Sequence, residues 1–263
     1  MSSLKGKFKA IRTTKQHEFT RKELEILSSC GKTHMQPGNY SNMLVFWPLY
    51  LKEHTKNVEV LNMVLVWTPK SRFLRFDDRI SPKSLMYAEK PYCRLINTKK
   101  RFLYIILAIN NPNGKSSHAN GLLYDTKKQT LEHFEPHGNG VQLKYTNLSL
   151  ATINKIKAYL TTTLGIPIKQ FRKLTTTCPR VGWQVRHGPK RISDSLFDEQ
   201  WSIGGYCAAW SMYFILLRAK NVTLSVLALQ MRAFENYEET SDYIHNFYYD
   251  FLRFKLKVLK RMK

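Results

Sequence analysis

The chain has 263 residues, of which 43% are hydrophobic and 13% aromatic, so it can build a substantial core and is not wholly disordered. Its longest strictly apolar run, residues 102–109, is too short to cross a bilayer, which takes about 20 residues. The net charge of +23 favours a polyanionic partner such as nucleic acid, with a basic surface that serves only solubility as the alternative.

Cysteine usage and the N-terminus bear on the compartment. The first residues do not combine a positive charge with a following apolar stretch, so we expect no secretory signal. The four cysteines form no C-x-x-C pair and no disulfide framework, which predicts reduced thiols in an intracellular protein. They are Cys30, Cys93, Cys178 and Cys207.

The first half of the chain is predicted to be rich in strands. Residues 1–37 are basic and polar, with a short helical pattern at 21–28, and form either an arm that contacts phosphate or a solvated tail. Three later segments are rich in Val, Ile, Leu and aromatic residues and are bounded by Pro, Asn or Gly, which is typical of strands. They are residues 43–47, 58–67 and 101–109.

The second half is predicted to be mostly helical after a β-hairpin at residues 118–135 and a short strand at 168–174. We find no internal repeat. Strands followed by helices predict an α+β fold, with a mixed β-sheet packed against helices. The predicted helices are residues 149–164, 206–219, 223–237 and 241–257.

The hairpin brings a histidine and a carboxylate together. If Asp125 and Lys128 close a two-residue loop, the same register sets His118 directly opposite Glu135 on one face of the sheet. Glu135 would then accept the Nδ1–H of His118 and leave Nε2 free as a base; a polar pair without a catalytic role is the alternative. Two neighbouring histidines have no opposed carboxylate in this register: His133 and His137.

A diglycine precedes the most apolar helix. Gly204 and Gly205 permit unusual backbone angles, and the segment that follows, 206–217, is apolar nearly all round, as expected of a central buried helix. Cys207 falls in its first turn, where the helix dipole and a nearby imidazolium would favour the thiolate. Its backbone N–H would face an oxyanion, although a buried cysteine that serves only as a small hydrophobe is the alternative.

The order of histidine, acid, glutamine and cysteine resembles the cysteine proteases related to the adenoviral maturation protease and to the SUMO- and ubiquitin-like-protein-specific proteases. The spacing from His118 to Glu135 and the segment Phe134-Glu135-Pro136-His137-Gly138 match the adenoviral enzyme, and Cys207 follows a glycine-bearing turn as the family nucleophile does. The resemblance covers residues 101–218. It is closest to variants with long N-terminal extensions in large cytoplasmic DNA viruses, which process virion precursors.

The resemblance implies a papain-like cysteine protease core of the adenain type, in which a central helix carries the nucleophile. It implies that Cys207 attacks the peptide carbonyl, His118 transfers protons and Glu135 orients His118. Residues 96–263 would form the catalytic core, and residues 1–95 an N-terminal extension packed on it.

Two positions depart from the family pattern or leave it ambiguous. The family histidine is usually followed by Trp, whereas Ala119 stands here, so the wall beside the base must be built differently. The oxyanion-hole glutamine is either Gln200, seven residues before Cys207, or Gln184 if residues 185–203 are an insertion. Both assignments stay open.

The implied function is a cysteine endopeptidase that cleaves after Gly-Gly or Gly-x-Gly in protein precursors, such as a virion polyprotein or a capsid or core protein. The alternatives are an isopeptidase that removes ubiquitin or SUMO, and a non-catalytic nucleic-acid-binding protein. No metal or cofactor is implied, and stimulation by DNA or by a peptide is left open. We expect non-specific nucleic-acid contact through the basic surface, no membrane partner, and a location inside cells, in the host cytoplasm or the virion if the protein is viral.

Overall fold

A computed structural model describes most of the sheet and its covering helices. The described residues are 19–28, 42–77, 99–110, 117–136, 148–173, 206–224, 229 and 237–261.

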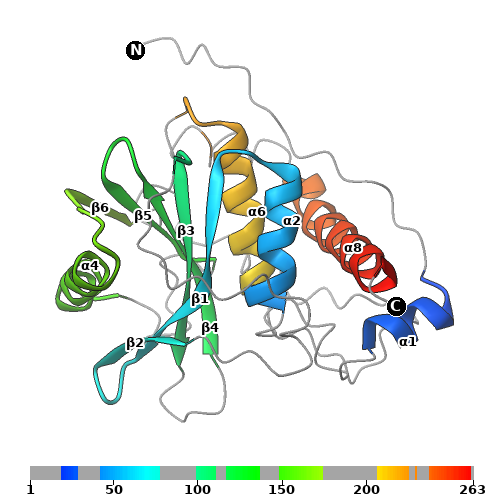
Figure 1. The fold of residues 1–263 in the computed structure, drawn as a ribbon, viewed down its shortest axis with the longest axis horizontal. Coiled ribbons are helices and arrows are strands. Elements are labelled where there is room, and N and C mark those ends of the chain that lie inside the picture. Colours follow the sequence, from blue (N-terminus) through cyan, green and yellow to red (C-terminus); the bar gives the residue numbers. More distant parts are fainter. Residues whose placement is uncertain are drawn as a thin grey trace.

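The described strands form one mixed sheet in the order β2-β1-β3-β4-β5-β6 (Figure 1). β1 runs parallel to β3 and β5 parallel to β6, while the other neighbours are antiparallel. The strands are β1 (Val58–Thr68), β2 (Phe73–Asp77), β3 (Phe102–Asn110), β4 (Ser117–Asp125), β5 (Thr130–Phe134) and β6 (Gln170–Lys173).

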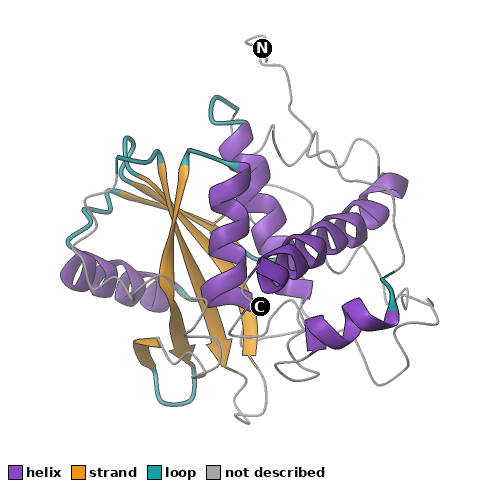
Figure 2. Cartoon of the chain, turned by 45° about the vertical axis from the view of Figure 1, so that its right-hand side comes forward, coloured by secondary structure: helices purple, strands orange, loops and turns teal. Residues whose placement is uncertain are grey.

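Helices cover both faces of the sheet. One face packs against α4, and the other packs against α2 and α6, with α8 on the outer side of these two helices and α1 beside α8 (Figures 1 and 2). This arrangement confirms the α+β prediction of a mixed sheet packed against a central helix. The helices are α1 (Arg21–Ser28), the π-helix η2 (Asn42–Phe46), α2 (Trp47–His54), α4 (Leu150–Leu164), α6 (Tyr206–Lys220) and α8 (Tyr237–Arg261).

The central strand β3 explains why the sheet has two covered faces. Its residues from Phe102 to Ile109 are all buried, a continuous apolar run typical of a strand with helices on both sides. Tyr104 and Ile106 belong to the core on the α6 side, whereas Ile105 belongs to the core under α4. The sheet therefore separates two apolar layers, and α6 lies in the larger one.

A buried ion pair fixes the C-terminal end of α6 to the sheet. Arg218 donates from Nε and Nη2 to the two carboxylate oxygens of Glu132 on β5, at 3.1 and 3.3 Å. Both side chains are almost fully buried. The Arg218 Nη1 also donates to backbone carbonyls just past the helix end, and the guanidinium lies 5.1 Å from the ring centre of Phe102. These contacts hold α6 at a set position against the sheet.

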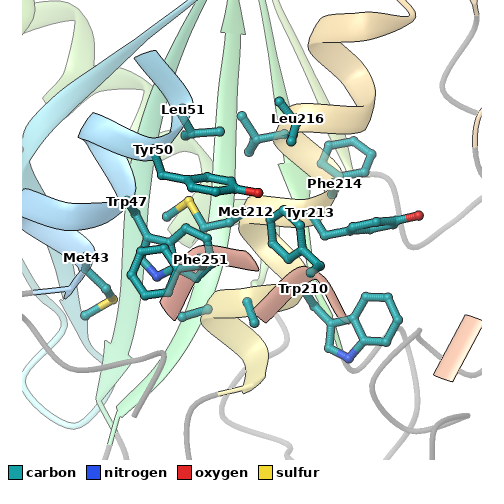
Figure 3. Packing of buried hydrophobic residues seen from close by; sticks show 14 of the residues in the cluster. Met43, Trp47, Tyr50, Leu51, Trp210, Met212, Tyr213, Phe214, Leu216 and Phe251 are labelled. Atoms are coloured by element: carbon teal, nitrogen blue, oxygen red, sulfur yellow. The ribbon is translucent and has the colours of Figure 1, made fainter. Parts of the chain in front are cut away.

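An aromatic cluster joins α2, α6 and α8, and it corrects one prediction. Residues 43–47 are predicted as a strand, but they form η2 and the start of α2. Trp47 stacks on Phe251 of α8 with ring centres 3.6 Å apart, and Pro48 occupies the first turn of α2, where its missing N–H costs nothing (Figure 3). The apolar run at 43–47 therefore belongs to helices that pack in the core. A short buried run of this kind is compatible with a strand and with a helix, which is why the strand prediction was wrong.

The other predicted elements agree with the described ones to within a few residues. The helix at 149–164 is α4, capped by Ser149, whose side chain accepts the N–H of Thr152, and ended by Gly165 with a φ of +66°. α8 is longer than predicted. The sequence does not predict β2, because this strand has only five residues and most of its side chains are exposed or half-buried. Most of the helix predicted at 223–237 lies outside the described residues.

The predicted boundary near residue 95 stays a prediction. β1 and β2, which precede that boundary, pair into the same sheet as β3. The segment before the boundary therefore contributes two strands to the sheet that carries the candidate site.

Candidate active site

The candidate site forms where β4 extends beyond its neighbour β5. β4 pairs with β3 over its whole length, from Ser117 to Asp125, but it pairs with β5 only from Gly121 onward. Among the described residues, the first residues of β4 therefore have no paired strand on the β5 side. The backbone N–H of Ala119 donates there to the Sγ of Cys207, at 3.4 Å. The first turn of α6 thus reaches this open edge.

His118 and Glu135 are brought together as predicted, in a different register. The structure pairs Asp125 with Thr130 instead of Lys128, which shifts β5 by two residues. The loop has four residues, because the Asp125 side chain accepts the N–H groups of Lys127 and Lys128 and so stabilises a longer turn. The prediction of a two-residue loop was therefore wrong.

The pair survives because the shift is an even number of residues. Side chains alternate between faces along a strand, so a shift of two leaves Glu135 on the face that carries His118. Continued past Phe134, the observed register would put Glu135 beside Asn120, diagonal to His118. The His118 Nε2 lies 2.6 Å from the Glu135 Oε1.

The ring nitrogen that faces the carboxylate is Nε2, which corrects the expected Nδ1. His118 also shares a side-chain hydrogen bond with Cys207. The sulfur is held by the N–H of Ala119, the next residue, so it lies close to the backbone of His118. Only Nδ1, the nitrogen nearer the backbone, suits that position, and the distal Nε2 reaches Glu135. Glu135 therefore backs the ring from the side away from the sulfur.

The charges in this cluster keep the His118 ring protonated. Burial by itself would lower the pKa of His118, whose side chain is 4% exposed. The negative charge of Glu135 and the hydrogen bond with Cys207 outweigh burial and raise the pKa to about 10. The arrangement is a protonated imidazole ring that contacts both the Cys207 sulfur and the Glu135 carboxylate.

This ion pair predicts a pH-dependent stability. The folded-state pKa of His118 lies above its ordinary value of 6.5, so its contribution to stability is complete below about pH 6.5 and disappears as the pH rises through about 10. We expect the free energy of unfolding of the wild type, relative to His118→Gln, to fall between pH 6.5 and 10. Urea denaturation of both proteins at pH 6, 8 and 10 measures this difference. A constant difference over that range would contradict the assignment.

The remaining predicted site residues divide into those that are placed and those that are not. Gln184, Gln200 and His137 lie outside the described residues, so the oxyanion glutamine stays a prediction. His133 is fully buried opposite Leu122, without an opposed carboxylate, as expected.

The structure adds Tyr104 to the surroundings of the sulfur. Its side chain is fully buried on β3. Burial and then the negative charge of Cys207 raise the pKa of its hydroxyl, so Tyr104 stays neutral. In the sequence it is one aromatic residue in an apolar strand, and no local signal distinguishes it from core.

The described residues contain no group of three or more His, Cys, Asp and Glu side chains placed to hold a metal ion. Among the described helices, none combines the length and the apolar character needed to cross a bilayer.

Comparisons with known proteins give distant likenesses. No family model matches the sequence. A stretch of 122 residues, 44% of this chain, is 27% identical to the putative ankyrin repeat protein L371 of Acanthamoeba polyphaga mimivirus, and it spans 15% of that protein's length. A solved structure of the SUMO protease Ulp1, with its catalytic cysteine oxidized to a sulfenic acid, aligns with 91% of this chain and 98% of its own, at a TM-score of 0.40 and 14% identity. The function therefore rests on the geometry of the site.

Proposed function

We propose that the chain is a cysteine peptidase with Cys207 as nucleophile, His118 as acid and base, and Glu135 as the orienting carboxylate. One observation carries the proposal: these buried side chains come from separate elements and form a continuous line of hydrogen bonds. The Cys207 Sγ contacts the Ala119 N–H and the His118 ring, and the ring contacts Glu135. A thiol, an imidazole and a carboxylate in this order are the parts of an activated sulfur nucleophile.

The proposed reaction is acyl transfer in two steps. The Cys207 thiolate adds to the peptide carbonyl, and the imidazolium of His118 gives its proton to the leaving amine as the C–N bond breaks. Water then adds to the thioester, giving one proton to His118, and the acid product leaves as the C–S bond breaks. The N–H of Cys207 would donate to the oxyanion in both steps, with Gln184 or Gln200 as the second donor.

The proposed substrate is a protein precursor cleaved after Gly-Gly or Gly-x-Gly, such as a virion polyprotein. The family-like segment 134–138 supports this substrate class, and the partial similarity to a mimivirus protein favours a viral precursor. The net charge of +23 supports an accompanying non-specific contact with nucleic acid.

A covalent probe tests this function. We expect a peptide vinyl sulfone ending in Gly-Gly to label the wild type at Cys207, because the sulfur of this residue shares a hydrogen bond with the His118 imidazolium, which would activate it. Peptide mapping by mass spectrometry locates the label, and Cys207→Ala is the matched control. Labelling spread over all four cysteines, or retained in the control, would refute the proposal.

The same probe separates the substrate classes. Full-length ubiquitin and SUMO vinyl sulfones run beside the Gly-Gly peptide should react more slowly than the peptide. A much faster reaction of either modifier would assign the isopeptidase activity instead. Repeating the labelling with DNA at low salt tests the nucleic-acid contact, which should accelerate it.

A further inference from the structure

The hairpin that joins β1 and β2, residues 68–77, has no part in the proposed reaction. It extends from one end of the sheet (Figure 1). Phe73, the first residue of β2, is 55% exposed, and Leu150 on α4 is the other exposed large hydrophobic residue among those described. Single exposed apolar residues are common, so the surroundings of each decide whether it has a function.

Phe73 is surrounded by positive charge. Lys70, Arg72 and Arg75 are all exposed. Residues 68–77 contain a single acid, Asp77, which is only 4% exposed and pairs with Arg75 at 3.6 Å. The hairpin therefore exposes three cations and an aromatic ring but no carboxylate. Leu150, in contrast, lies in an uncharged stretch, residues 148–154.

The backbone of the hairpin sets Phe73 and Arg75 on one face. Leu74 and Phe76 pack against the core under α4, so Phe73 and Arg75, which alternate with them, point to the opposite face. At the tip, Arg72 has a φ of +51°, a left-handed conformation that glycine adopts more readily. The tip thus presents a guanidinium at a position where the backbone favours glycine.

The hairpin lies at the same end of the sheet as the candidate site. Trp67 on β1 pairs with Leu74 on β2 and with Ile109 on β3, and Ile109 pairs with His118 on β4. Leu74 and His118 are therefore three strand spacings apart, or about 14 Å. A molecule bound along the hairpin would lie beside the proposed catalytic residues.

We propose that the β1–β2 hairpin binds single-stranded nucleic acid, with a base stacked on Phe73 and phosphates bound by Lys70, Arg72 and Arg75. An aromatic face accepts any unpaired base, and neighbouring cations contact the backbone without reading sequence. Charge complementarity selects this partner, because the chain as a whole carries a net charge of +23. The proposal deepens the nucleic-acid contact that accompanies the proposed function, since it names the surface and the form of the strand.

Fluorescence anisotropy with a labelled oligothymidylate, which has no secondary structure, tests the surface. We expect Phe73→Ala to weaken binding about 5- to 10-fold without changing its salt dependence, because the stacked base is lost while the phosphate contacts remain. Combining Lys70→Ala, Arg72→Gly and Arg75→Ala should lower the slope of log K against log salt by about 2, since three phosphate contacts are lost.

Matched variants separate this surface from general charge and exposure. Leu150→Ala, which removes the other exposed apolar side chain, should leave binding unchanged. A variant that loses the same charge from exposed positions on α8 should change the salt slope less than half as much as the hairpin variant. It combines Lys257→Ala, Lys260→Ala and Arg261→Ala. In a duplex of the same oligothymidylate the bases are already paired, so Phe73→Ala should not alter duplex binding.

Unchanged binding by Phe73→Ala, or an equal loss of salt slope in the α8 variant, would overturn the proposal. Polyglutamate that displaces the strand from the wild type but not from Phe73→Ala would assign the hairpin to an acidic protein instead. Ultraviolet cross-linking of the wild type needs no variant and should attach the strand at Phe73; a cross-link only at other residues would also overturn the proposal. Binding is measured without cleavage: a wild type that cleaves no peptide but binds the strand through Phe73 would remove the proposed function and leave the hairpin site intact.

Discussion

Cys207→Ala is expected to abolish cleavage, lowering kcat/KM by about 10⁴-fold or more, and to change the free energy of unfolding by about 1 kcal/mol or less. The loss is large because no other described group is placed to attack the carbonyl. The stability change is small because the substitution removes a single sulfur atom at a helix start, where the backbone contacts of α6 remain. Peptide cleavage and urea denaturation measure the two effects.

The variants of the other two residues should form a graded series with Cys207→Ala. His118→Ala removes the proton donor and the positive charge beside the sulfur, so it should reduce both cleavage and the alkylation rate of Cys207 at neutral pH. Glu135→Ala should reduce cleavage less, because an orienting group contributes less than the group that transfers the proton. Equal losses from His118→Ala and Glu135→Ala would give the acid a different role. Full cleavage by Cys207→Ala would exclude the mechanism.

Arg218→Met is expected to have the largest effect on stability, lowering the free energy of unfolding by about 3–5 kcal/mol. The substitution leaves the Glu132 carboxylate buried without its bidentate partner, and it removes the donor to the carbonyls past α6. Urea denaturation measures the loss.

Two control variants test whether the loss of stability comes from the unpaired Glu132 charge or from the lost backbone contacts of Arg218. The double variant Arg218→Met with Glu132→Leu should recover most of the loss, because it leaves no unpaired charge and fills the space with apolar atoms. Lys260→Met, which breaks the half-exposed pair with Glu23, should cause a far smaller change. A double variant as unstable as Arg218→Met would show that the arginine acts mainly through its backbone contacts.

The candidate site was predictable from the sequence to the extent that it depends on local rules. Alternation along a strand sets His118 and Glu135 on one face, and this holds although the turn was predicted with two residues too few. The register itself depends on the Asp125 side chain, which accepts two backbone N–H groups and so stabilises a four-residue loop. The sequence at 125–128 fits a two-residue loop as well, so the loop length could not be predicted from it. The start of α6 follows from the apolar pattern after the diglycine.

The contacts that the sequence did not reveal join residues far apart in the chain. Glu132 and Arg218 are separated by 86 residues, and each lies in a segment whose local pattern is ordinary. Residues 43–47 were assigned to a strand because an apolar run fits either element, and only their packing on α8 decides for a helix.

The contact between Ala119 and the sulfur has a consequence for natural variation at this position. The donor is the main-chain N–H, which every amino acid except proline supplies. The small size of the Ala119 side chain therefore costs the Cys207 sulfur no hydrogen bond. Burial of the Ala119 side chain in the core, and not this hydrogen bond, limits the size of residue 119, while proline at this position should abolish cleavage because it removes the donor.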